Sequence, residues 1–535
     1  MDIARQKEIA QTVTAGKAVL GMEFGSTRIK AVLLDAHNRI IAQGHHLWEN
    51  QMVDGLWSYS QEAVIAGMQD CYAALAADVK AVCGAELTHL AGAGISAMMH
   101  GYLAFDSSDR LLVPFRTWRN TNTAQAAAEL SELFNYNIPL RWSISHLYQA
   151  ILNGEPHTAD ITFFTTLAGY IHWQLTGEKV LGIGDASGML PIDPSTKDYS
   201  AQMIEKFDVL AASKGFDKPL RSILPGILMA GQNAGTLTDE GAKRLDISGR
   251  LRGGIPFCPP EGDAGTGMVA TNSVRQRTGN VSAGTSSFSM IVLEKDLSRP
   301  YEAIDMVTTP DGSLVAMVHC NNCTSDLNAW VGVFREFAEL MGVKADIGEI
   351  YGRLYNHALT GDADCGGLVA YNYFSGEPVM GFATGAPLFV RSVNDRFNLA
   401  NFVRTNLNAA VAVLKIGNDI LFNTEKVKVD RITGHGGFFK TEGVGQRILA
   451  AALNTPISVM ETAGEGGAWG MALLVSYMVN NPDERTLDGW LDNVVFAGNK
   501  GSEIAPTPEE VEGFNRYIAA YTACLPVEAA ATTVK

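Results

Sequence analysis

Two short turns and one isolated carboxylate carry residue types suited to phosphate chemistry. Gly25-Ser26-Thr27 and Gly284-Thr285-Ser286 each join a glycine to two hydroxyl side chains. Small turn residues let backbone N–H groups approach phosphate oxygens, and the hydroxyls add donors without bulk. Asp263 lies in the glycine-rich stretch 261–267, which we expect to be a loop outside any helix or strand. Taken alone, this aspartate is equally well explained as a turn former.

The elements around both turns follow one pattern. Apolar runs flank Gly25 within residues 18–35, which predicts two antiparallel strands joined by a tight turn. A third strand is expected at 39–43 and a helix at 61–82. A similar strand–turn–strand unit recurs at 278–294, which indicates duplication of a whole domain. We therefore predict an α/β protein in which the two turns face each other across a cleft that holds a polyphosphate.

Bulk properties exclude several classes of function. The 535 residues carry a net charge of −16, and a nucleic-acid partner usually needs a basic face. No apolar stretch approaches 18 residues, so no membrane association is expected, and seven scattered cysteines suit a reduced cytoplasm. Cys320 and Cys323 form a C-x-x-C pair without a second pair at zinc spacing, so buried free thiols are the preferred interpretation. Neither a P-loop nor a Rossmann fingerprint is present.

Several motifs, in order along residues 18–478, resemble those of the FGGY carbohydrate kinases, with xylulokinases and ribulokinases as the nearest type. They are Glu23-Phe-Gly-Ser-Thr27, Ser96-Ala-Met-Met-His-Gly101, Phe115-Arg-Thr-Trp-Arg-Asn120, Leu175-Thr-Gly-Glu178, Asp185-Ala-Ser-Gly188, Glu261-Gly-Asp-Ala-Gly-Thr-Gly267, Asn280-Val-Ser-Ala-Gly-Thr-Ser286, Tyr373-Phe-Ser-Gly-Glu377, Thr433-Gly-His-Gly-Gly437 and Ala463-Gly-Glu-Gly-Gly-Ala-Trp-Gly470. The resemblance implies two ribonuclease-H-like (actin-like ATPase) domains with the active site in the interdomain cleft.

The implied domains run from 18 to 272, with the sugar site, catalytic aspartate and first phosphate motif, and from 273 to 480, with the second phosphate and adenosine motifs. Residues 1–17 are expected to be a helical extension, and 481–535 a tail with a helix near 508–521. The resemblance is also compatible with a homodimer.

The same resemblance assigns roles to individual residues. It makes Asp263 the general base for transfer from ATP to a ketose hydroxyl. Glu23, through water, and Asp263 are the expected Mg²⁺ groups. The expected sugar contacts are Met99, His100, Trp118, Arg119, Asn120 and Asp263, and the expected ATP contacts are Gly25, Ser26, Thr27, Gly284, Thr285, Ser286, Gly436, Gly437 and Phe438. Residues 319–326 are expected to line the cleft.

Two departures from the family pattern keep alternatives open. Glu23 stands where aspartate is usual, and Ala264 replaces an asparagine that often follows the catalytic aspartate in xylulokinases. A ketopentose is the first candidate substrate, and a hexulose or deoxy-ketose is the second. A non-catalytic actin-like nucleotide-binding protein is the third interpretation, although such a protein needs neither Met99-His100 nor Asp263.

Overall fold

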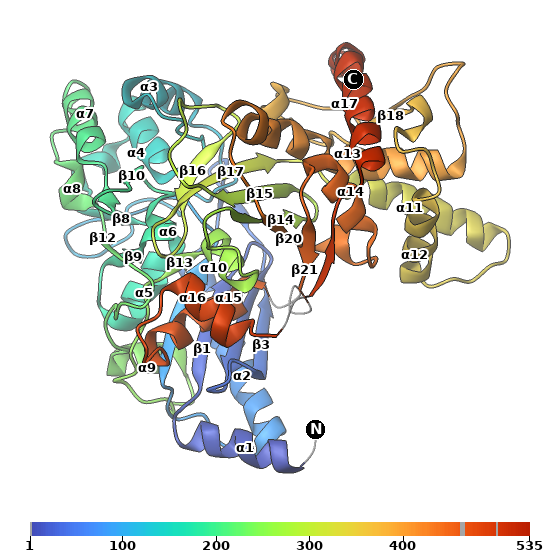
Figure 1. The fold of residues 1–535 in the computed structure, drawn as a ribbon. Coiled ribbons are helices and arrows are strands. Elements are labelled where there is room, and N and C mark those ends of the chain that lie inside the picture. Colours follow the sequence, from blue (N-terminus) through green and yellow to red (C-terminus); the bar gives the residue numbers. More distant parts are fainter. Residues whose placement is uncertain (1–2, 461–465, 499–500, 535) are drawn as a thin grey trace. The chain divides into compact units, whose positions relative to one another are not determined.

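The computed structural model describes residues 3–460, 466–498 and 501–534 (Figure 1). The chain divides into two compact units, residues 1–274 with 306–315 and 465–497, and residues 275–305 with 316–464 and 498–535. Residues 466–497 therefore group with the first unit, although they follow most of the second unit in the sequence. The domain limits expected from the sequence, 18–272 and 273–480, stay predictions.

The first unit is built on a five-stranded sheet in the order β13-β6-β1-β2-β3. β1 pairs antiparallel with β2, and β2 with β3, whereas β1, β6 and β13 run parallel to one another. The predicted hairpin around Gly25 is therefore confirmed. The strands are β1 Val19–Phe24, β2 Arg28–Leu34, β3 Ile40–Leu47, β6 Gly92–Ala97 and β13 Glu261–Gly262.

Helices cover this sheet and smaller two-stranded ribbons extend from it. The predicted extension helix and the helix expected at 61–82 are both present, as α1 and α2. The helices are α1 Ile3–Thr14, α2 Gln61–Cys83, α3 Ala124–Phe134, α4 Ser143–Leu152, α5 Leu167–Thr176, α6 Ile183–Ala186, α7 Ala201–Ala212, α8 Leu220–Ile223, α9 Asp239–Leu245, α10 Asp263–Ala270, α15 Gly466–Val479 and α16 Leu487–Trp490. The ribbons pair β4 Gln51–Val53 with β5 Leu56–Ser58, β7 Leu103–Phe105 with β8 Phe163–Thr165, β9 Val180–Gly182 with β12 Gly226–Leu228, and β10 Ile192–Asp193 with β11 Asp198–Tyr199.

The helix α15 lies directly on the first sheet and beside α10 (Figure 1). Glycines make this close approach possible. A Cβ at Gly21 would lie 2.3 Å from the Ala468 carbonyl oxygen, and one at Gly470 would lie 2.0 Å from the Thr266 carbonyl oxygen. The strand β1 and both helices therefore pack closely together, and this packing fixes the position of α10 relative to β1.

The second unit repeats the topology of the first. Most strands of a seven-stranded sheet belong to it. The sheet has the order β16-β17-β15-β14-β20-β21-β22, with β14 antiparallel to β15 and parallel to β20, and residues 306–315, which include most of β16 and the start of β17, group with the first unit. The strands are β14 Thr278–Ala283, β15 Ser287–Val292, β16 Asp305–Thr308, β17 Leu314–Cys320, β20 Arg431–His435, β21 Ile457–Val459 and β22 Ser502–Ile504. The predicted duplication is visible in the shared pattern of an antiparallel hairpin followed by parallel strands.

Long helices and one further ribbon complete the second unit. They are α11 Ser325–Leu340, α12 Ile347–Ala358, α13 Leu399–Asp419, α14 Val444–Leu453 and α17 Pro508–Ala531, with the ribbon β18 Val369–Tyr371 and β19 Leu388–Val390. The tail helix predicted near 508–521 is α17, which continues ten residues further. Thr507 caps its first turn, because its side chain accepts a hydrogen bond from the Glu510 N–H. Among the described helices, none is long and apolar enough to cross a membrane.

Candidate active site

Asp263 is the first residue of α10 and follows β13 directly. The expectation of a loop was wrong. Glycine is a poor helix former, so the stretch 261–267 gives little local helix signal, and packing of α10 on α15 decides the outcome. The position at a helix N-terminus matters for chemistry, because the helix dipole and free N–H groups favour an ionised carboxylate there.

Met99 and His100 lie beside Asp263 in the first unit. The Met99 N–H donates to Asp263 Oδ1 at 3.2 Å. His100 has a φ of +66° and Gly101 one of +85°, so two successive residues take the left-handed conformation just after β6. Such backbone is unfavourable for a residue with a side chain and is retained where the surroundings impose it. The turn thus brings the predicted base and two predicted sugar contacts together.

Both ring nitrogens of His100 are used by the protein. Nδ1 lies 3.0 Å from the Gly188 carbonyl oxygen, an acceptor, so Nδ1 carries the proton and donates it. Arg141 donates from Nε to Nε2 at 3.3 Å, and the Trp142 ring stacks 6.2 Å away. His100 is therefore neutral in this arrangement. Arg141 and Trp142 were missed at the sequence level, because no motif surrounds them; only proximity to His100 in the fold identifies them.

Four carboxyl groups gather around α10 in the first unit. Burial, the largest influence on each, raises the pKa of Glu23 and of Asp185 to about 7, that of Glu261 to about 8 and that of Asp263 to about 6. Negative charge on Asp263 adds to the effect at Glu23 and Asp185. Raised pKa values in a cluster of this kind are typical of functional sites. The sequence did not lead us to expect Asp185 and Glu261 in this cluster, although both residues lie in motifs recognised there.

Backbone donors hold two of these carboxyl groups in place. Glu261 accepts from the N–H groups of Gly184 and Asp185 at 3.3 and 3.0 Å. The Thr166 hydroxyl donates to Asp185 Oδ2 at 2.6 Å, while Asp185 Oδ1 is buried without a hydrogen-bond partner among the described residues. The α6 N-terminus is thus fixed to β13, the strand that ends just before Asp263.

Glu23 reaches the N-terminus of α15. The Ala468 N–H donates a hydrogen bond to its carboxylate, which opposes the effect of burial on its pKa. A Cβ at Gly467 would lie 2.1 Å from Glu23 Oε1, so glycine is what admits the longer side chain. The end of the motif at 463–470 is described here, whereas 463–465 lie outside the described residues.

The first hydroxyl turn is tied to one predicted sugar residue. Trp118 Nε1 donates to Ser26 Oγ at 3.3 Å, and the Tyr59 hydroxyl donates to the Ser26 carbonyl at 2.6 Å. Gly25 closes the turn by donating to the Arg28 carbonyl, and Thr27 is exposed beside it. Trp118 therefore links the predicted sugar segment to the predicted phosphate turn.

Arg119 and Asn120 are held elsewhere. The Arg119 guanidinium lies 4.1 Å from the centre of the Trp57 ring and donates to Asn50 Oδ1 at 3.1 Å. The Asn120 side chain accepts from the Trp57 N–H and donates to the Trp57 carbonyl, both at 2.8 Å. These bonds give Asn120 a structural role in anchoring the β5 strand. Sugar contacts for the two residues stay predictions.

In the second unit, the predicted phosphate and adenosine residues are neighbours. β14, which ends before Gly284, pairs with β20, and a Cβ at Gly436 would lie 2.5 Å from the Ala283 carbonyl oxygen. Thr285 is exposed and Ser286 half-buried at the tip of the hairpin. A Cβ at Gly284 or Gly437 would meet no atom within 4 Å, so both backbones border open space.

The side chain of Phe438 does not border that space. It is fully buried and packs edge-on against Phe439, with ring centres 5.5 Å apart. A nucleotide contact at this position would therefore come from backbone, as at Gly436, where φ is +101°.

The carboxylates of this site fit a magnesium ion only if water and phosphate supply most of its ligands. Among the described residues, no group of three or more His, Cys, Asp or Glu side chains could hold a metal. Glu23 and Asp263 offer carboxylate oxygens, and Mg²⁺ usually binds one or two carboxylates, several waters and the substrate phosphates. Cys320 and Cys323 are free, buried thiols, as expected.

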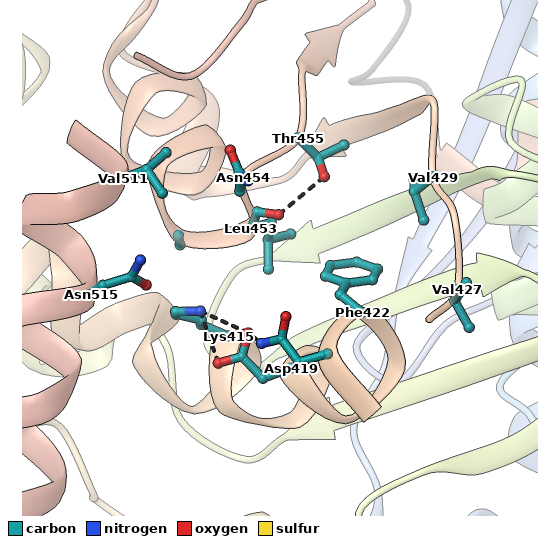
Figure 2. Close-up of a pocket in the computed structure, with 12 residues that line it drawn as sticks. Lys415, Asp419, Phe422, Val427, Val429, Leu453, Asn454, Thr455, Val511 and Asn515 are labelled. Atoms are coloured by element: carbon teal, nitrogen blue, oxygen red, sulfur yellow. Dashed lines mark hydrogen bonds and ion pairs between the residues drawn. The ribbon is translucent and has the colours of Figure 1, made fainter. Parts of the chain in front are cut away.

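A further cavity of about 360 Å³ lies in the second unit and contains none of the predicted site residues (Figure 2). Lys415, the only cation among the described residues that line it, donates to both carboxylate oxygens of Asp419, at 2.7 and 2.8 Å. Its charge is thereby neutralised, so the cavity has little to attract a phosphate.

Comparisons with known proteins show which family of sequences this chain matches. Models of the FGGY family of carbohydrate kinases match twice, the N-terminal domain at residues 18–269 and the C-terminal domain at 279–479. A xylulose kinase of Escherichia coli is 24% identical over 53% of this chain and 56% of its own length, so this match spans little more than half of that relative. A xylulose kinase of Haemophilus influenzae is 24% identical over 70% of this chain and 74% of its own.

Solved structures share the fold at lower identity. A ligand-bound xylulose kinase of Lactobacillus acidophilus is 16% identical with a TM-score of 0.77, and the match covers 96% of this chain and 98% of the other. A gluconate kinase from the same organism gives 16% identity, a TM-score of 0.76 and the same coverage. The two-domain, actin-like architecture predicted from the sequence is therefore confirmed. Because a xylulose kinase and a gluconate kinase match equally well, the fold does not select the sugar.

Proposed function

Because the chain belongs to the FGGY family of carbohydrate kinases, we propose that it transfers the γ-phosphoryl group of ATP to a hydroxyl of a ketose, with a ketopentose such as xylulose or ribulose as the substrate. The observation that carries this proposal is Asp263 at the start of α10, in hydrogen-bond contact with the Met99–His100 turn. The names of the curated relatives support the choice of ketose.

In this mechanism Asp263 accepts the proton of the attacking hydroxyl. Phosphoryl transfer asks the protein mainly for positioning and for neutralisation of charge, plus one group to orient and deprotonate the nucleophile. Backbone N–H groups of Met99 and Ala264 hold the Asp263 carboxylate in place, where it would receive the proton. A magnesium ion held by Asp263 and, through water, by Glu23 would neutralise phosphate charge.

The sugar would be recognised by the residues around that turn. His100 is neutral and held by Gly188 and Arg141, so its ring is positioned before substrate arrives. Preorganised polar groups discriminate strongly between sugars, because a wrong sugar leaves buried donors or acceptors unpaired. On the nucleotide side, the Gly284–Ser286 turn offers backbone N–H groups and two hydroxyls to the phosphates.

The proposal is tested by ADP release from ATP and Mg²⁺ in the presence of single sugars. The panel contains xylulose, ribulose, a hexulose, a deoxy-ketose and gluconate, with a reaction without sugar as the control. We expect ADP release to depend on sugar and to be fastest with a ketopentose. A faster rate with the hexulose or the deoxy-ketose would change the substrate. ADP release that no sugar accelerates would favour a non-catalytic or sensing protein and contradict the proposal.

A further inference from the structure

One acidic side chain of the second unit is connected to the phosphate turn through a continuous set of hydrogen bonds. Glu377 is fully buried, and its carboxylate faces the connection between β17 and α11. It accepts from the Asn321 N–H at 3.3 Å, from the Asn322 N–H at 3.3 Å and from Asn322 Nδ2 at 3.0 Å. Hydrogen bonds to an ionised carboxylate are roughly twice as strong as bonds between neutral groups, so three such bonds hold this connection in place.

Residues 372–376, which precede Glu377, also form hydrogen bonds with this connection. Asn322 Oδ1 accepts from the Ser375 N–H at 3.1 Å, and Asn321 Nδ2 donates to the Gly376 carbonyl at 2.8 Å. Asn372 Nδ2 donates to the Cys323 carbonyl at 2.7 Å. Residues 321, 322 and 323 are thus each bonded to the segment 372–377, and all of these bonds lie inside one unit.

The connection in turn holds the hairpin tip. The Cys323 N–H donates to the Thr285 carbonyl at 2.9 Å. Thr324 donates twice to the Gly284 carbonyl, from its N–H at 3.0 Å and from its hydroxyl at 2.8 Å. The connection therefore holds the Gly284 and Thr285 carbonyls, while the Ser286 carbonyl accepts from the Gly284 N–H at 2.9 Å. The N–H groups and hydroxyls of Thr285 and Ser286 are the donors that the turn can offer to a ligand.

We infer that Glu377 is a positioning residue for nucleotide binding: through Asn321 and Asn322 it sets the place of Cys323 and Thr324, and through them the shape of the Gly284–Ser286 turn that contacts the phosphates. This inference rests on the proposed function, because it assigns the turn to ATP. It gives the Tyr373–Glu377 motif a physical task. A turn displaced by about 1 Å loses phosphate contacts that depend on direction, which can cost roughly a hundredfold in turnover.

The test is the dissociation constant for ATP, measured by calorimetry with Mg²⁺ and without sugar, for the wild-type chain and for Glu377→Gln. The substitution keeps size but puts an amide NH₂ against backbone donors, so we expect the dissociation constant to rise roughly tenfold or more. In turnover assays the KM for ATP should rise in parallel, while the KM for the sugar stays within about twofold.

The matched control is Glu528→Gln. Glu528 is also fully buried in the second unit and accepts a backbone N–H, from Ala386 at 2.8 Å. Within the described part of the chain no hydrogen bond joins Glu528 to the connection, so its substitution should lower the melting temperature and leave ATP binding unchanged. A second variant, Thr324→Val, removes the hydroxyl bond to Gly284 and a long bond of 3.5 Å from Asn328 Nδ2, and it should weaken ATP binding by a smaller factor. This variant keeps the inference testable if Glu377→Gln fails to fold.

The outcomes separate the two proposals. If the wild-type chain binds ATP but Glu377→Gln and Thr324→Val bind it equally well, the inference is wrong, and a fall in melting temperature alone would assign Glu377 to stability. If the wild-type chain binds no ATP, the proposed function and the inference both fail. If it binds ATP but no sugar accelerates ADP release, the proposed function fails, and the ATP dissociation constants of the two variants still test the inference.

Discussion

At Asp263 two influences oppose each other. Burial raises the pKa of the carboxyl group, and N–H groups of Met99 and Ala264 lower it, which leaves the pKa raised to about 6. A general base works best when its pKa lies near the operating pH, because it must be ionised and still be basic enough to accept a proton. Negative charge on Asp263 in turn raises the pKa of Glu23 and of Asp185.

The first prediction concerns the pH dependence of kcat/KM for the sugar. Because only ionised Asp263 can accept a proton, kcat/KM should be level above about pH 7 and fall about tenfold per pH unit well below pH 6. Initial rates between pH 5 and 8.5 at constant ionic strength check this. A profile that is flat down to pH 5 would exclude Asp263 as the titrating base.

The second prediction concerns stability and Asp185, whose pKa burial raises to about 7. The folded state then binds a proton more tightly than the unfolded state, where the pKa is about 4. The contribution to stability is complete below pH 4 and is lost as the pH rises through 7. The melting temperature should therefore fall between pH 5 and 8, and Asp185→Asn should reduce that fall.

The control for Asp185 is Asp217→Asn, an exposed residue of the same unit. Its substitution should leave the slope of melting temperature against pH as it is in the wild-type chain. If Asp185→Asn gives the wild-type slope as well, Asp185 does not titrate in this range.

At the scale of elements, α10 and α15 decide where the chemistry sits. The glycine-rich stretch 261–267 was expected to be a loop, and it instead begins a helix. The helix α15 likewise begins in a glycine-rich stretch, at Gly466. Local propensity could not predict this, because the reason is the contact of the two helices with each other and with β1. The strands and the two hairpins were predictable, since alternating apolar runs around a Gly-hydroxyl turn are strong local signals.

The third prediction tests the packing of α15. Gly467→Ala would normally stabilise a helix by up to about 1 kcal/mol. Here the new methyl group would lie 2.1 Å from Glu23 Oε1, so we expect the substitution to lower the free energy of unfolding by about 1–3 kcal/mol. Urea unfolding, monitored by circular dichroism, measures the difference.

The matched substitution is Gly352→Ala in α12, where a Cβ would meet no atom within 4 Å. It should be neutral or stabilise by up to about 1 kcal/mol. If both alanines were equally well tolerated, Glu23 would not be in contact with the start of α15.

At the scale of the whole molecule, two units of like topology carry different halves of the predicted chemistry. The first holds Asp263 and the Met99–His100 turn, and the second holds the Gly284–Ser286 turn and the Gly436–Gly437 backbone. The order of motifs along the chain predicted this division, because each half begins with its own hairpin. We did not predict the contacts of Arg141, of Trp142 or of Glu377 with the connection between β17 and α11, because the residues in contact are distant in the sequence.

The central claim is that Asp263 takes the proton from a sugar hydroxyl during phosphoryl transfer. The most direct measurement is kcat of Asp263→Asn with ATP and the best sugar of the panel, beside its melting temperature and its dissociation constant for ATP. We predict a fall in kcat of about 10²–10⁴-fold, with the folded state and ATP binding retained. A kcat within about threefold of the wild-type value would contradict the account.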